Sequence, residues 1–372
     1  VGGWLDTLPY LLDSPAFDEA LVARIIDSAR RQLAWQVAHV QKPGNIRLFQ
    51  ANTFLWAALT LADLPESPTW LQAARDIYAD TARRDIEPDG SHIEHLPGYH
   101  GLYQRTFREL SLWARAFPDA RLPADSRTAA RVFEYAVAAR RPNGENCGLG
   151  DSAGAWTGGG SLQDVLRQRV EVRRLAGLPD ADPPLAGAFH DAGQVFLRDG
   201  WGPDATHLVF DATRWGGAHS HLGRNGVQLH AFGRTLVTDP GALTYAMGHK
   251  ANEGDALDAA IGPYGKSTRA HNTLTLNGWN QAPTNPDFLR AYHAEGCHAV
   301  VSRYSGGYWP GAYGWWFEQG FGAGLHAEHD RILVWLPGRC AVVIDTMMRW
   351  DEVTPGSAAH ASPSLEMNWQ LT

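Results

Sequence analysis

Apolar positions in the first half of the chain recur at helical spacing. From residue 21 to residue 37 an apolar side chain returns at every fourth position, which places one stripe along one side of a helix. Ser14 and Pro15, just before this stripe, are typical of a helix start. Further helices are predicted over residues 51–62, 69–81, 101–116, 124–140 and 162–175, in segments of two to four turns that end at Pro or Gly. Helices of this length separated by short loops indicate paired helices in a toroid or bundle.

After about residue 188 the pattern changes to short runs rich in β-branched and aromatic residues, separated by Gly and Asp-Gly turns. Many short strands at close spacing favour a layered antiparallel sandwich. The predicted strands are 195–197, 207–210, 227–232, 235–238, 273–276, 332–335 and 341–344. Helices followed by strands predict an α+β chain of two packed domains. We place a helical domain at residues 1–180 and a β-sandwich at 188–372, with the Pro/Asp-rich stretch 179–184 between them.

Composition bounds the classes of protein to consider. The chain has 372 residues, 44% of them apolar and 19% charged, an ordinary globular balance. A net charge of −8 excludes a global basic footprint for nucleic acid, so an anionic substrate would need a local basic cleft. No apolar run approaches the ~18–20 residues of a membrane span. The three cysteines lie far apart and indicate neither a disulfide framework nor a cysteine-based zinc site.

The chain begins without Met and stops in a strand-like run, so both ends are expected to be cut from a longer protein, the sandwich at its C-terminal end included. Secreted, periplasmic and cytoplasmic locations all stay open, and so does the oligomeric state.

Two imidazoles and a carboxylate stand in three separate segments of the second half. They are His221, Asp239 and His271, and this set suits a zinc ion whose fourth position is open or holds water. Ligands from separate segments would also pin the sheet, so the metal is either structural or catalytic. The alternative is that each histidine is a satisfied core or surface residue. His219 lies two positions before His221, so on one strand the two would share a face.

A second polar cluster, DGSHIEHLPGYH at residues 89–100, precedes a predicted helix. It holds two carboxylates, three imidazoles and a phenol within twelve residues. One interpretation is a capped, solvated loop. The other is the rim of an active site, with Tyr99 as an acid or base. A third piece, PGNIR at residues 43–47, is another turn next to a helix and indicates nothing alone.

Taken together and in this order, the three clusters resemble the heparinase II/III-like polysaccharide lyases. GLGDSAGAW (148–156) is similar to the Gly-Asp-Ser loop of that family, and FHDAGQVFLRDGW (189–201) to the entry of its β domain. GGAHSHLGRNGVQLHAFGRTLVTDPGALTY (216–245) and KSTRAHNTLTLNGWNQ (266–281) resemble its β-domain signature. The resemblance implies an incomplete (α/α) toroid joined to an antiparallel β-sandwich. It also implies β-elimination at a uronic acid, and relatives that are longer at both ends.

The resemblance also implies roles for individual residues. Tyr99 matches the catalytic tyrosine, Asn45 an asparagine that neutralises the substrate carboxylate, and His219 the histidine that faces the substrate. The metal ligands would be His221, Asp239 and His271, with zinc as the expected ion, and we assign contacts with an acidic polysaccharide or oligosaccharide to Arg269, His95 and Glu94.

Two departures from the family pattern keep other functions open. Ile46 stands where a histidine often follows the asparagine, and Gly223 stands where a carboxylate is usual after the His-x-His pair. They motivate the hypothesis of an impaired relative that binds acidic glycan without cleaving it. A glycoside hydrolase is the other alternative, and it would need a carboxylate pair drawn from Asp89, Glu94 and Asp151. The sequence predicts a lyase but does not name its polymer.

Overall fold

The computed structural model describes residues 5, 7, 10, 11, 13, 14, 17–152, 160–243, 256–310, 324–349 and 364–371. The chain divides into two compact units. The first comprises Val1–Glu87 and Arg105–Ala129, and the second comprises Pro88–Gln104 and Ala130–Thr372. The division predicted at residues 180–188 stays a prediction.

Six helices lie in the first half of the described chain, as the apolar spacing predicts. They are α2 (Glu19–Ala38), α3 (Asn45–Thr60), α4 (Ser67–Arg84), α5 (Pro97–Ala116), α6 (Ser126–Ala138) and α7 (Leu162–Leu175). Ala29 and Leu33 of the predicted stripe are buried on α2. The predicted start at Ser14 is wrong, and Pro15 lies outside the described residues. The helix begins at Glu19 because the Asp18 carboxylate accepts a hydrogen bond from the Leu21 amide at 2.7 Å, which caps its first turn.

Helices α3 and α5 begin earlier than predicted, at Asn45 and Pro97 instead of residues 51 and 101. Proline fits a first helical position because the N–H that it lacks would have no partner inside the helix. As a result Asn45 and Tyr99 lie in first turns of helices, where backbone N–H groups still seek acceptors, and not in the preceding loops.

The second unit contains two main antiparallel sheets. One has the order β1-β2-β3-β4-β5 and the other the order β12-β11-β9-β8. Their strands are β1 (Ala186–Phe189), β2 (Gln194–Arg198), β3 (His207–Asp211), β4 (Gly226–Ala231), β5 (Arg234–Val237), β8 (Phe288–Ala294), β9 (Cys297–Tyr304), β11 (Ala327–Leu336) and β12 (Cys340–Arg349). Two short pairs join β13 (Leu365–Met367) to β6 (Leu274–Leu276), and β10 (Tyr308–Trp309) to β7 (Asn280–Gln281).

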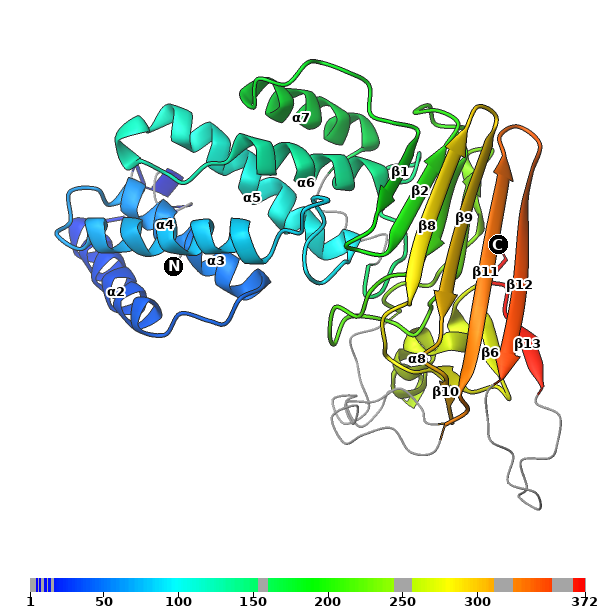
Figure 1. Cartoon of the computed structure of the whole chain (residues 1–372). Coiled ribbons are helices and arrows are strands. Elements are labelled where there is room, and N and C mark those ends of the chain that lie inside the picture. The colour runs from blue at the N-terminus through cyan, green and yellow to red at the C-terminus, as the bar shows by residue number, and fades with distance from the viewer. Residues whose placement is uncertain are drawn as a thin grey trace. The chain divides into compact units, whose positions relative to one another are not determined.

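The two main sheets pack face to face around an apolar core (Figure 1). Val195 and Leu197 of β2 point into it, as do Leu333 and Trp335 of β11. Because side chains alternate along a strand, Phe196 points to the opposite face of β2 and packs with Tyr135 of α6. The predicted helical part followed by an antiparallel sandwich is therefore confirmed. Helix α8 (Ala256–Lys266) and strands β8 and β9 lie where the sequence analysis predicted no element.

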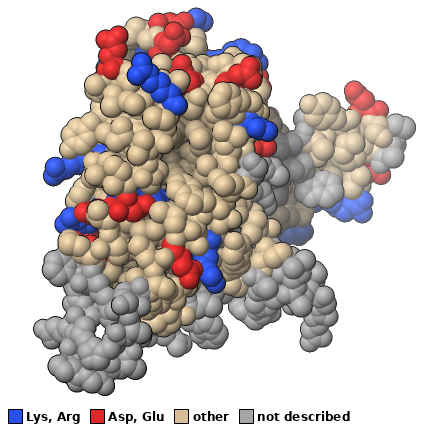
Figure 2. Space-filling view, turned by 90° about the vertical axis from the view of Figure 1, so that its right-hand side faces the viewer, with Lys and Arg blue, Asp and Glu red and all other residues tan. Residues whose placement is uncertain are grey.

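Charge on the described surface is mixed in sign. Figure 2 shows acidic and basic side chains interspersed among wide uncharged areas on the face that it draws. Within the described ranges, no helix combines the length and the apolar character that crossing a bilayer requires.

Candidate active site and metal centre

The three predicted metal ligands come together in the second unit, on loops that follow strands or a short helix. His221 lies in the loop between β3 and β4, Asp239 follows β5, and His271 follows the 3₁₀ helix η4 (Thr268–Ala270). All three side chains are buried, and one potential ligand atom from each lies within 4.8 Å of the others. His219 and His221 both lie in the β3–β4 loop, so the alternation of faces along a strand does not apply to them.

Hydrogen bonds orient both imidazoles of this trio. Asp239 Oδ2 lies 2.6 Å from His271 Nδ1, and Asp151 Oδ1 lies 2.8 Å from His221 Nε2. An ionised carboxylate only accepts, so each ring donates at that nitrogen, and a neutral ring then carries a lone pair on the other. Burial lowers the pKa of His221 to about 4, which keeps its ring neutral.

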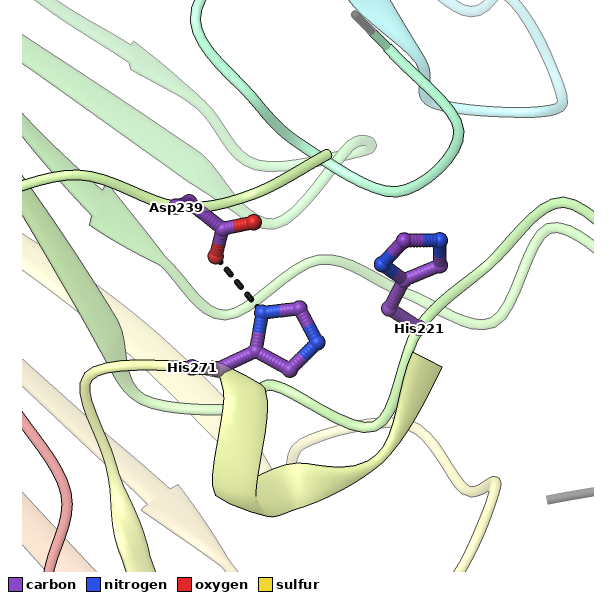
Figure 3. A group of neighbouring side chains, drawn as sticks. All are labelled: His221, Asp239 and His271. Carbon is purple, nitrogen blue, oxygen red and sulfur yellow. Dashed lines mark hydrogen bonds and ion pairs between the residues drawn. The ribbon is translucent and has the colours of Figure 1, made fainter. Parts of the chain in front are cut away.

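The remaining ring nitrogens, His221 Nδ1 and His271 Nε2, are buried and have no hydrogen-bond partner among the described residues. Figure 3 shows a ring nitrogen of each histidine directed toward the space between the three side chains. Two unsatisfied lone pairs beside a carboxylate are the donor set that zinc binds in proteins. The buried group can therefore hold a metal ion.

A carboxylate that the sequence analysis considered only for a hydrolase connects this trio to its surroundings. Asp151 accepts hydrogen bonds from His219 Nδ1 at 2.7 Å, from His221 Nε2 at 2.8 Å and from Lys266 Nζ at 2.9 Å. Burial alone would raise the pKa of Asp151, but these two histidines and the Lys266 charge hold that pKa well below its usual range. Asp151 is therefore an ionised group inside the protein.

The segment that carries Asp151 packs closely against its neighbours. A Cβ at Gly148 would lie 2.5 Å from the Asp239 carbonyl oxygen, and one at Gly150 would lie 2.8 Å from the His219 carbonyl oxygen. The Asp151 amide donates to that same His219 carbonyl at 3.0 Å. Ser152 Oγ accepts from the amide of Gly98, in the first turn of α5, at 2.9 Å. Glycine at 148 and 150 thus lets the backbone approach closely enough to connect these elements.

Tyr99 and His219 meet although they are 120 positions apart in the sequence. The Tyr99 hydroxyl lies 3.4 Å from His219 Nδ1, and the two ring centroids are 4.5 Å apart. Both side chains are half-buried. The phenol and the imidazole from two predicted site segments therefore form one pair, which also touches Asp151 through His219.

The other predicted site residues have different surroundings. Glu94 is half-buried, whereas His95 is 6% exposed, with its Nδ1 3.4 Å from the Arg214 carbonyl oxygen. Arg269 is largely exposed and pairs with Glu366 at 3.4 Å. Asn45 is half-buried in the first unit. Their roles toward substrate stay predictions.

At Gly223, one of the two departures from the family pattern, the neighbouring His271 ring leaves no room for a side chain. A Cβ at this position would lie 2.7 Å from Cγ of His271 and 3.1 Å from its Cβ. Any side chain at position 223 would have to displace the His271 ring. Glycine at position 223 therefore lets the backbone lie directly against the ring of a predicted metal ligand.

Several residues that hold the site together were not singled out from the sequence, although they lie inside the motifs quoted above. Lys266 ends α8 and contacts Asp151, and Ser152 follows Asp151. Asn272, next to His271, donates to the carbonyls of Val227 at 2.9 Å and Thr238 at 2.6 Å. Their membership of the motifs was the only signal in the sequence.

Comparison with known proteins agrees with this arrangement. The chain matches the family described as Heparinase II/III N-terminus over residues 5–168 and the family described as Heparinase II/III-like, C-terminal over residues 181–371. A heparin-sulfate lyase of Pedobacter heparinus is 23% identical over 296 residues, which cover 75% of this chain and 43% of that protein. A heparin-sulfate lyase of Bacteroides thetaiotaomicron is 23% identical over 317 residues, with the same two shares.

Solved structures show the same fold. A crystal structure of heparinase III has a TM-score of 0.73 at 18% identity and covers 92% of this chain and 53% of its own. That of a heparan sulfate lyase from Pedobacter heparinus has a TM-score of 0.68 at 21% identity, with shares of 92% and 52%. The chain spans about half the length of the relatives that it matches. From its matched segments, its helices followed by antiparallel sheets and its buried histidine–aspartate group, the chain belongs to the heparinase II/III-like family.

Proposed function

We propose that this chain is the catalytic part of a polysaccharide lyase that cleaves a uronate-containing acidic glycan by β-elimination. The observation that carries the proposal is the Tyr99–His219 pair, with the hydroxyl 3.4 Å from Nδ1. It places two groups able to transfer protons side by side on the unit that also holds the buried metal-ligand trio. The lyases that the chain resembles act on heparin sulfate, so a glycosaminoglycan-type polymer is the first substrate class to test, with alginate as the second.

The reaction needs a base, an acid and a way to mask the substrate carboxylate. Removal of the C5 proton leaves charge that spreads onto the adjacent carboxylate, and groups aimed at that charge lower the barrier. We assign the proton transfers to Tyr99 and His219: one takes the C5 proton, and one returns a proton to the oxygen that leaves C4. The C5–H and C4–O bonds break, and a C4–C5 double bond forms. Asn45 and Arg269 are assigned to the substrate carboxylate, and Glu94 to the sugar hydroxyls.

We give His95 a supporting role in this proposal. Its ring is buried and its Nδ1 lies 3.4 Å from the Arg214 carbonyl oxygen, so we assign it to holding the backbone that precedes Tyr99. A bound zinc ion would supply a fixed positive charge, and His221, Asp239 and His271 would hold it. Those ligands would thereby fix the β3–β4 loop, and with it the backbone that carries His219.

The test combines a substrate screen with one substitution. Uronate polymers are offered to the full chain, and product is followed by the ultraviolet absorbance of the new double bond, which hydrolysis does not produce. Tyr99→Phe is expected to lower kcat by about 10²–10⁴-fold because it removes the proton-transferring hydroxyl and keeps the ring. Tyr292→Phe, on an exposed side chain of β8, is the matched control and should leave kcat unchanged. Full turnover by Tyr99→Phe would reject the assignment.

An impaired relative that binds acidic glycan is the second candidate, and Ile46 favours it. This apolar side chain is 61% exposed in the first turn of α3, next to Asn45. Glycan binding without unsaturated product, followed by turnover in an Ile46→His variant, would establish this candidate. The matching replacement Gly223→Asp is not a clean test, because its side chain would displace His271.

The hydrolase alternative loses support from two of its three carboxylates. Asp89 accepts hydrogen bonds from the amides of Asp191 at 2.8 Å and Ser91 at 3.0 Å, so its oxygens hold the backbone. Asp151 has a pKa well below its usual range, because its histidine hydrogen bonds outweigh the effect of burial. A glycosidase acid needs a raised pKa instead.

A further inference from the structure

One carboxylate connects the two parts of the proposed site. Asp151 Oδ2 accepts from His219, the partner of Tyr99, and Asp151 Oδ1 accepts from His221, a predicted metal ligand. The Asp151 side chain is 5% exposed.

Lys266 supplies the opposite charge. Its ammonium group donates to Asp151 Oδ2 and to the Ala218 carbonyl oxygen, both at 2.9 Å. The Ala218 contact ties the lysine to the residue directly before His219. The side chain of Lys266 is 7% exposed, so the ion pair is screened little by water.

The backbone around Asp151 reinforces the same connections. The Asp151 amide binds the His219 carbonyl, and Ser152 binds the first turn of α5, which carries Tyr99. Gly148 lies against the Asp239 backbone. Three elements that hold proposed site residues, the β3–β4 loop, α5 and the segment after β5, thus contact one five-residue segment, residues 148–152.

We propose that Asp151 is a positioning residue shared by the metal trio and the Tyr99–His219 pair, with Lys266 as its counter-charge. The part of this proposal that concerns metal binding depends only on the buried trio. The part that concerns the orientation of His219 rests on the proposed lyase function. A carboxylate on the far nitrogen of a metal-binding histidine fixes the tautomer and raises ligand basicity, and its loss typically weakens metal binding by about 10–100-fold. The same carboxylate sets the direction of the His219 ring beside Tyr99.

The experiment uses the full chain, stripped of metal by a chelator, and zinc alone as the probe. Asp151→Asn keeps the shape of the side chain but removes the negative charge opposite the buried Lys266 ammonium, which is destabilising. Asp151→Asn with Lys266→Met removes both charges, so it separates loss of folding from loss of positioning. Glu134→Gln is the matched control: that carboxylate binds Arg169 at 2.8 Å and Arg173 at 2.7 Å in the same unit and does not belong to the trio.

Zinc affinity is measured by competition with a coloured chelator, and folding by circular dichroism. Both Asp151 variants are expected to bind zinc about 10–100-fold more weakly than the wild type, and Glu134→Gln as tightly as the wild type. With zinc saturating, the double variant should show kcat lowered by about 10–100-fold with KM nearly unchanged, because a misdirected His219 affects the chemical step.

The outcomes separate this proposal from the proposed function. A folded double variant that binds zinc like the wild type and keeps full kcat would overturn the positioning role. Weakened zinc binding in the double variant, with no turnover of any uronate polymer by the wild type, would support the part that concerns metal binding while rejecting the lyase. Wild-type turnover with an unchanged kcat in the double variant at saturating zinc would reject the part that concerns His219.

Discussion

Two groups of buried imidazoles in the second unit differ in the groups to which their ring nitrogens are hydrogen-bonded. In the metal trio, His221 and His271 each donate to a carboxylate, and their other nitrogens are directed into one shared space. The second group is His92, His95 and His100, in the segment before and at the start of α5. Here His95 Nδ1 lies 3.4 Å from the Arg214 carbonyl oxygen and His100 Nε2 lies 2.8 Å from the Val132 carbonyl oxygen.

The second group packs like a set of aromatic rings. His92 lies 5.0 Å from the Tyr103 ring and 5.5 Å from the His100 ring, and His100 lies 4.5 Å from the Tyr135 ring. Both nitrogens of His92 are buried with no hydrogen-bond partner among the described residues. Burial alone therefore does not predict that a histidine binds a metal. A carboxylate on the far nitrogen, which fixes the ring and directs its lone pair, distinguishes the first group from the second.

The largest expected effect is on stability at low pH, through the second group. Burial lowers the pKa of His95 and of His100 to about 4, and that of His92 well below its usual value. The folded rings stay neutral while the unfolded chain takes up protons below about 6.5. Stability is thus fully present above that pH and falls as pH drops toward about 4, by about 3 kcal/mol for each of His95 and His100, and His92 acts in the same direction. Urea unfolding at a series of pH values measures it.

A substitution sharpens this prediction. His100→Gln keeps a donor near the Val132 carbonyl and removes one titrating ring, so the dependence of the unfolding free energy on pH should become less steep. His190→Gln changes an exposed histidine and should leave that dependence unaltered. An equal slope in all three proteins would contradict neutral burial of the second group.

A smaller effect is expected from removing metal. Zinc at about 100 times its dissociation constant should stabilise the folded chain by about 2.7 kcal/mol, and a chelator should abolish this. His271→Ala should remove the zinc-dependent part of the melting temperature. His329→Ala provides the control, because His329 also donates to a carboxylate, Asp345 at 2.7 Å, but is not in the trio. Zinc stabilisation that survives His271→Ala would contradict the assignment of zinc binding to the trio.

The smallest effect is expected at Gly223. Gly223→Ala places a methyl group 2.7 Å from Cγ of His271, so the ring must shift, at a cost of about 1–2 kcal/mol. Its zinc affinity should fall as well. Gly202→Ala meets nothing within 4 Å and should change neither quantity. Thermal melting with and without zinc distinguishes the two variants.

The sequence predicted the parts of this protein that local patterns control. Apolar residues at helical spacing, in segments that end at Pro or Gly, located the six helices. Runs rich in β-branched and aromatic residues located most strands of the sandwich. The three ligand segments were recognised because each stands in a motif of unusual composition. Helix α8 and strands β8 and β9 were missed, and the starts of α3 and α5 were placed too late, because a proline or glycine can either end a loop or begin a helix.

The sequence by itself thus determined which side chains are able to bind a metal, transfer a proton or pair with a carboxylate. Only the tertiary structure decided their partners. Asp151 meets His221 from 70 positions away and Lys266 from 115. Such pairings have no period along the chain, since packing of loops between the strands creates them. Gly223 shows the same limit, because a missing side chain acquires a meaning only once the His271 ring is seen against it.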